Sequence, residues 1–159
     1  MTKKRLLREF RGQTEGSQKA MAMVGKIGWT GNEILLGRVN WTMQHMVEAM
    51  DYYRVSFARL MGTPTEVPPK ITLTDGLTEY KQACARMLQF LEQIPEQDYC
   101  RMIEHENVAG EGEFEDIFWR WIYGHDKFHL GSLMALLRIA GGPRLQLPFV
   151  HGVLREKAA

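Results

Sequence analysis

The sequence has few cysteines and no long apolar run. Cys84 and Cys100 are its two cysteines and form no Cys-x-x-Cys pair, so their spacing excludes a disulfide framework and favours a reducing compartment. No stretch approaches the roughly 18 uninterrupted apolar residues of a membrane-spanning helix. The basic residues near the N-terminus are not followed by an apolar segment, so we predict no signal peptide. Together these absences predict a cytoplasmic protein.

An excess of charge of one sign is also absent. The formal net charge is +1, so nothing indicates nucleic acid or an anionic membrane as a partner. Basic side chains do gather between residues 3 and 11, and we interpret them as the solvated face of a first helix. At 159 residues, with 45% apolar and 25% charged residues, the chain predicts one globular domain over residues 1–159 with a sizeable core.

Signatures of several enzyme classes are missing. None of the three serines lies in a Gly-x-Ser-x-Gly motif, which excludes the nucleophile elbow of serine hydrolases. No Gly-x-x-x-x-Gly-Lys loop is present to bind phosphate, and the acidic segment 110–112 is typical of a turn. The ten methionines lie mostly at helical core spacing, where flexible packing explains them.

What the sequence does contain is helical periodicity, most clearly between residues 32 and 61. Apolar residues repeat there at alternating spacings of three and four, as in the seam of a bundle helix. The seam comprises Leu36, Val39, Met43, Met46, Met50, Tyr53, Phe57 and Leu60. Asn32 suits the start of this helix, and Gly62 with Pro64 suits its end.

Three further segments have helical spacing. They are residues 5–27, a segment that begins near Thr72 or Thr74 and ends before Pro95, and residues 113–140. Glycines interrupt the first segment, and the proline-rich residues 62–71 form an extended connection. Strand-like alternation is confined to the tail, residues 145–153. We therefore predict an all-α four-helix bundle with long connections and a short C-terminal tail.

The last predicted helix carries His125 and His129, four positions apart. Its apolar face comprises Ile117, Phe118, Trp121, Phe128, Leu136 and Ile139. At 3.6 residues per turn, both histidines fall near the centre of that face, one above the other. Two imidazoles that point into a core need hydrogen-bond partners or a metal ion. This segment alone leaves both possibilities open.

His45 has a different place on its helix. It lies about 100° from the centre of the seam, on a flank that includes Thr42, Ala49 and Tyr52. Such a position suits a half-exposed histidine without a ligand role, and it equally suits a metal ligand at the mouth of a cleft between helices. Helical periodicity does not distinguish these two interpretations.

The segment 124–133, Gly-His-Asp-Lys-Phe-His-Leu-Gly-Ser-Leu, resembles the signature of the DinB/YfiT-like superfamily of four-helix-bundle metalloenzymes. The last long helix of that family carries His-x-x-x-His followed by a small-residue pattern. His125, His129 and Gly131 match this pattern, whereas Ser132 stands where glutamine is common. Helix order and the proline-rich link also look alike, so the resemblance covers nearly the whole chain.

The family has a further ligand histidine early in its second helix, and the similar stretch of this chain, residues 39–49, puts His45 there. The resemblance therefore implies that His45, His125 and His129 hold one divalent metal ion. His105 and His151 match nothing in the family pattern, and we expect both at the surface.

Three neutral imidazoles would leave coordination positions open, where a metal lowers the pKa of water toward 7 or holds a thiolate. Zinc or nickel suits three nitrogen ligands. The resemblance implies a metal-dependent hydrolase or a transferase that uses a low-molecular-weight thiol, acting on a small-molecule substrate, and it implies a homodimer. Two other interpretations stay open: a non-catalytic metal- or ligand-binding bundle of a stress response, and a structural bundle whose paired histidines bond to side chains.

Catalytic side chains are harder to identify. Asp126 follows the first histidine of the pair, as in His-Glu-x-x-His helices whose carboxylate is the general base, but the aspartate is one methylene shorter. An exposed carboxylate beside Lys127 is the alternative that we favour for Asp126. Glu48 and Tyr52 follow His45 on its helix and are further weak candidates, although bundle tyrosines are usually packing residues.

Overall fold

The computed structural model describes residues 3–67 and 75–143, and these are mostly helical. The helices are α1 (Lys3–Val24), α2 (Glu33–Met61), α3 (Gly76–Gln93), α4 (Phe114–Trp121) and α5 (Lys127–Ile139), with a 3₁₀ helix η1 (Glu96–Cys100) and a π-helical segment η2 (Ile122–Asp126). Because most of the described residues are helical, the predicted all-α class is confirmed. The predicted tail at residues 145–153 and the helix start at Thr72 or Thr74 lie outside the described residues.

Local chemistry explains where α2 ends and where α3 begins. Gly62 follows α2 with a positive φ of 67°, which glycine adopts without strain, and Thr63 N–H closes the helix by donating to Ala58 O. Asp75 caps α3, because its side chain accepts from the N–H groups of Leu77 and Thr78. Asn32 precedes α2 as predicted, but its side chain forms no capping hydrogen bond.

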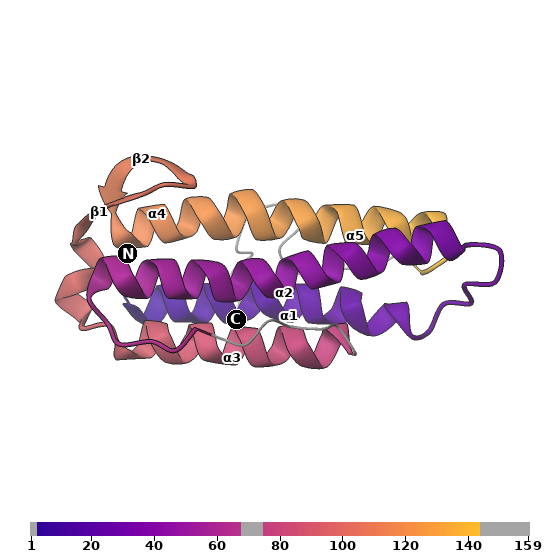
Figure 1. The fold of residues 1–159 in the computed structure, drawn as a ribbon, viewed down its shortest axis with the longest axis horizontal. Helices are drawn as coiled ribbons and strands as arrows, with labels where there is room; N and C mark the ends of the chain where they lie inside the picture. The colour runs from indigo at the N-terminus through magenta and orange to yellow at the C-terminus, as the bar shows by residue number, and fades with distance from the viewer. Residues whose placement is uncertain (1–2, 68–74, 144–159) are drawn as a thin grey trace, which may run out of the picture.

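Four long helical segments pack side by side, the fourth formed by α4, η2 and α5 together (Figure 1). Both α1 and α2 contact α3 and α5, so the order around the core is α1, α3, α2, α5. Six of the eight predicted α2 seam residues are buried, and Leu36 and Leu60 at its two ends are half-buried. Among the described residues, no helix combines the length and apolar character needed to cross a membrane.

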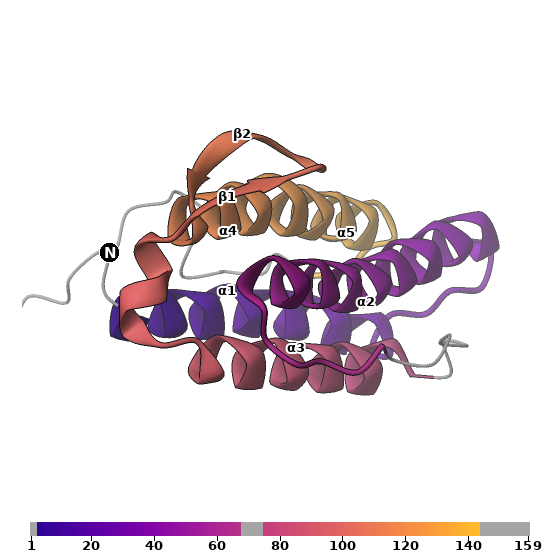
Figure 2. The ribbon, with the colours of Figure 1, turned by 60° about the vertical axis from the view of Figure 1, so that its left-hand side comes forward.

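A small antiparallel hairpin precedes α4, and we did not predict it. Its strands are β1 (Met102–His105) and β2 (Val108–Glu113), and they lie over α4 at one end of the molecule (Figure 2). Both strands are short and carry several charged residues and glycines, so neither shows a long apolar alternation. The expectation of strand-like structure only in the C-terminal tail is therefore wrong.

Candidate metal centre

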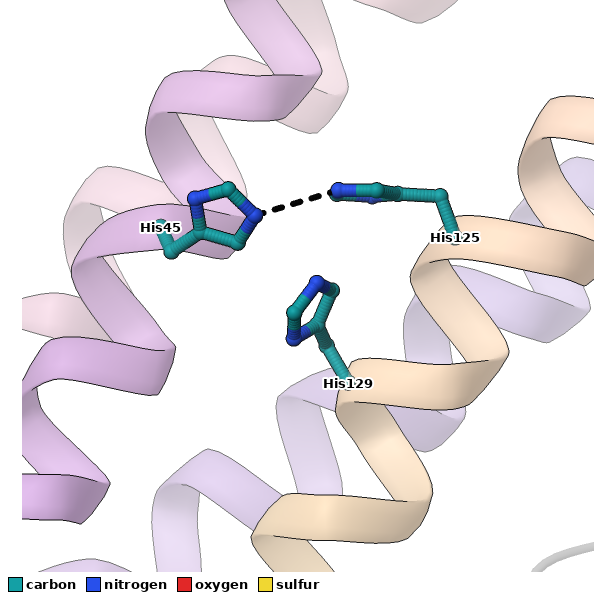
Figure 3. Close-up of side chains that lie close together, drawn as sticks. All are labelled: His45, His125 and His129. Atoms are coloured by element: carbon teal, nitrogen blue, oxygen red, sulfur yellow. Dashed lines mark hydrogen bonds between the residues drawn. The ribbon is translucent and has the colours of Figure 1, made fainter. Parts of the chain in front are cut away.

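The imidazoles of His45, His125 and His129 form one cluster. Each residue offers a ring nitrogen, and the three nitrogens all lie within 4.8 Å of one another. The Nε2 atoms of His45 and His125 are 3.1 Å apart, within hydrogen-bond distance. His45 projects from α2, whereas His125 and His129 project from η2 and α5 across the seam between the helices (Figure 3). The structure thus brings together the three residues that the sequence selected.

The π-helical segment η2 decides where His125 and His129 point. A π turn holds one residue more than an α turn, so every core-facing position beyond it moves one residue later than an α-helical pattern predicts. The buried positions from this segment onward are Asp126, His129, Leu130, Leu133 and Leu137, where uninterrupted α-helical spacing would give 125, 129, 132 and 136. His125 is half-buried at the edge of this face, whereas His129 is buried, and both rings reach His45 on α2.

The same rotation overturns part of the predicted apolar face. Ile117, Phe118 and Trp121 precede or border η2 and are buried as expected. Phe128 and Ile139 follow it and are 67% and 69% exposed. The prediction assumed one continuous α-helix, so it is wrong for Phe128 and Ile139, whereas His129 is buried as predicted and Leu136 is half-buried.

The spacing of the nitrogens suits a divalent metal. With zinc–nitrogen bonds of 2.0–2.1 Å and tetrahedral angles, ligand nitrogens lie about 3.3–3.4 Å apart, close to the 3.1 Å between His45 and His125. No carboxylate or thiolate of the described residues belongs to this cluster, so protein ligands would leave the double charge of the metal uncompensated.

The environment favours the neutral imidazoles that coordinate metals. Burial, together with smaller contributions from the neighbouring rings of His129 and His45, lowers the pKa of His125 to about 4. Burial also lowers the pKa of His129, with a smaller contribution from His45. Since metal and proton compete for the same nitrogen lone pair, both shifts make these rings available for coordination near neutral pH.

Asp126, beside His125, is buried and belongs to a different network. Its Oδ1 accepts from the hydroxyl of Tyr80 at 3.0 Å, and its Oδ2 accepts from Gln13 Nε2 at 3.1 Å and Ser17 Oγ at 3.3 Å. The preferred expectation of an exposed carboxylate is wrong, since Asp126 is only 3% exposed. Burial raises its pKa, although the three hydrogen bonds act in the opposite direction. These hydrogen bonds connect it to α1 and α3.

The other two candidate catalytic residues are also engaged elsewhere. Glu48 is exposed and accepts a hydrogen bond from Gln44 one turn earlier on α2. Tyr52 donates its hydroxyl proton to Glu106 and accepts from Asn107 Nδ2, both in the turn of the hairpin. The structure therefore does not bring Glu48 or Tyr52 into the histidine cluster.

Sequence reasoning missed His105, which we expected at the surface. It lies on β1 and is 2% exposed. Its ring stacks on that of Tyr53 with 5.2 Å between centroids, and the tilted ring of Phe57 lies 4.8 Å away, again between centroids. Its Nδ1 accepts from the N–H of Asn107, its Nε2 has no hydrogen-bond partner, and burial lowers its pKa. The alternation of Ile103 with His105 was the signal that indicated an inward position. His151 lies outside the described residues.

Two exposed aromatic residues at the cluster were also missed. Trp41 stacks on His45 at an interplanar angle of 5°, and Phe128 meets the ring of His129 edge-on. Trp41 precedes His45 by one turn of α2, a spacing that predicts such a contact.

Comparison with protein family models, with curated proteins and with solved structures finds no match for this chain. What the site can do is therefore argued from its own geometry.

Proposed function

We propose that this protein is a metal-dependent enzyme in which His45, His125 and His129 hold one zinc or nickel ion. The observation that carries the proposal is the convergence of three imidazole nitrogens within 4.8 Å, from helices far apart in the sequence. The three ligands and the bundle agree with the resemblance to the DinB/YfiT-like superfamily. That resemblance adds a homodimer to the proposal, and the composition of the sequence adds a cytoplasmic location.

The chemistry that suits this site is hydrolysis, or transfer to a low-molecular-weight thiol. When bound, the metal would supply Lewis-acid activation of water, a thiol or a substrate oxygen at its open coordination positions. The protein would contribute three imidazole donors, and because it adds no carboxylate to the cluster, the ion would keep its full positive charge. A small-molecule substrate with a donor atom is the ligand class that such a site attracts.

A separate observation supports a second candidate function. Asp126, Glu48 and Tyr52 each form hydrogen bonds away from the histidines, so none is placed as a general base. A bundle that binds a metal or small ligand without turnover satisfies this arrangement equally well. An assay with a panel of esters and thiol acceptors distinguishes the two functions. An enzyme would turn over some of these compounds and lose this activity in His129→Ala, whereas a non-catalytic bundle would turn over none.

Metal analysis tests the first step. Protein purified without a histidine tag and reconstituted with zinc is expected to hold about one equivalent per chain. His129→Ala is expected to lose it, and His105→Asn, a buried histidine outside the cluster, is expected to keep it. A wild-type content below about a tenth of an equivalent would contradict the proposal.

A further inference from the structure

Two large aromatic side chains lie exposed directly against the histidine cluster. Trp41 on α2 is 58% exposed, and its ring centroid is 5.2 Å from that of His45 in a parallel stack. Phe128 on α5 is 67% exposed, with its centroid 5.2 Å from that of His129 at an interplanar angle of 80°. Neither ring fills the core, so packing of the bundle does not account for them.

The two rings border one site from different helices. Trp41 also meets His129 edge-on, at 6.5 Å between centroids, so it touches ligands on both sides of the α2–α5 seam. Phe128 contacts the same His129. A molecule bound at the open coordination positions would therefore have aromatic surface beside it on both helices.

We propose that Trp41 and Phe128 form the subsite for a planar aromatic group on the ligand whose donor atom binds the metal. The inference rests on the proposed function, because it needs a metal on the three histidines. Aromatic rings favour stacked or edge-on partners beyond simple burial of area, and both rings are free to provide them. The structure thus assigns a substrate class: small molecules with an aryl group next to a metal-binding head.

A small molecule suits this surface better than a second copy of the chain. Ile34 continues the exposed α2 stripe and is 84% exposed, but the exposed Arg38 lies between it and Trp41. The exposed Glu48 follows on the other side of His45. Charged side chains therefore interrupt the apolar surface of α2 on both sides of the metal centre, whereas a stable dimer buries roughly 800 Å² on each partner.

The test compares two probes that share one chelating head. Benzohydroxamate carries a phenyl ring and acetohydroxamate a methyl group, and each is titrated into the zinc-loaded protein by calorimetry. We expect benzohydroxamate to bind about tenfold more tightly. Trp41→Ala and Phe128→Ala should each weaken benzohydroxamate by roughly threefold to tenfold and leave acetohydroxamate unchanged.

Ile34→Ala is the matched control, since it removes an exposed apolar side chain from the same face of α2 and should change neither affinity. Equal binding of the two probes to zinc-loaded protein would overturn the inference alone. Equal weakening of both probes in Trp41→Ala would also overturn it, because the ring would then act only through His45. So would conversion of a dimer to a monomer by Trp41→Ala in sedimentation. Absence of zinc binding would overturn the proposed function as well.

Discussion

His125 and Asp126 are neighbours in the sequence, yet their side chains contact different helices. Nε2 of His125 lies 3.1 Å from Nε2 of His45 on α2, while Oδ1 of Asp126 accepts a hydrogen bond from Tyr80 on α3. The π-helical segment that contains both residues makes this division possible, because it turns Asp126 inward. The buried carboxylate therefore holds the segment that presents the histidine.

Zinc should stabilise the folded protein through the cluster. At a free zinc concentration one hundred times the dissociation constant, binding adds about 2.7 kcal/mol, or roughly 5–10 °C in Tm for a chain of this size. His45→Ala should abolish this increase, because two imidazoles remain. Differential scanning fluorimetry with and without zinc measures it. An equal increase in the variant and the wild type would show that zinc binds elsewhere.

Replacement of Asp126 should destabilise the fold and disturb the metal site. Asp126→Leu leaves the donors of Gln13, Ser17 and Tyr80 without their acceptor, at a cost of about 3 kcal/mol in the free energy of unfolding. Asp126→Asn keeps an acceptor and should cost about 1 kcal/mol. Urea denaturation gives both values.

The same two variants separate anchoring from general stability. Under conditions where both are folded, Asp126→Leu should bind zinc more weakly than Asp126→Asn in competition with a chromophoric chelator. Asp116→Asn, an exposed carboxylate on α4, should match the wild type in both measurements. Unchanged zinc affinity in Asp126→Leu would show that the carboxylate does not position His125.

Acid should weaken the metal-free protein through its buried imidazoles. The pKa values of His105, His125 and His129 are all lowered in the folded state, chiefly by burial. The unfolded chain therefore binds more protons, and the free energy of unfolding falls as the pH drops below about 6.5, the ordinary histidine pKa. For His125 the loss continues until its folded pKa of about 4.

His105→Asn isolates one contribution to this acid sensitivity. Asparagine keeps an acceptor for the N–H of Asn107 but has no titrating ring, so stability should fall less steeply between pH 6.5 and 5 than in the wild type. Urea unfolding at several pH values in the presence of a chelator gives the slopes. Identical slopes would mean that His105 does not titrate in this range.

Glu48 and Tyr52 should be dispensable for metal binding. Their hydrogen bonds go to Gln44 and to the hairpin turn, so Glu48→Gln and Tyr52→Phe should change zinc affinity by less than about twofold, well below the energy of one lost ligand. His129→Ala serves as the positive control in the same chelator competition. A tenfold loss in either variant would place that side chain at the metal.

Much of the fold could be predicted because helix formation leaves a local pattern. The apolar repeat revealed α2, and Asn32 and Gly62 located its two ends to within a residue. Both signals depend on only a few neighbouring positions. The hairpin was missed because its strands of 4 and 6 residues are stabilised by pairing with each other and by contact with α4. Such contacts leave little trace in periodicity.

The sequence by itself determined which three histidines to consider and which helices carry them. Only the tertiary structure decided how they meet, because one additional residue in the π-helical segment rotates everything after it. That rotation buries Asp126, moves His125 and His129 toward His45, and leaves Phe128 exposed at the site. A prediction from hydrophobic periodicity assumes a constant number of residues per helical turn. Packing against α1, α2 and α3 determines where that number changes.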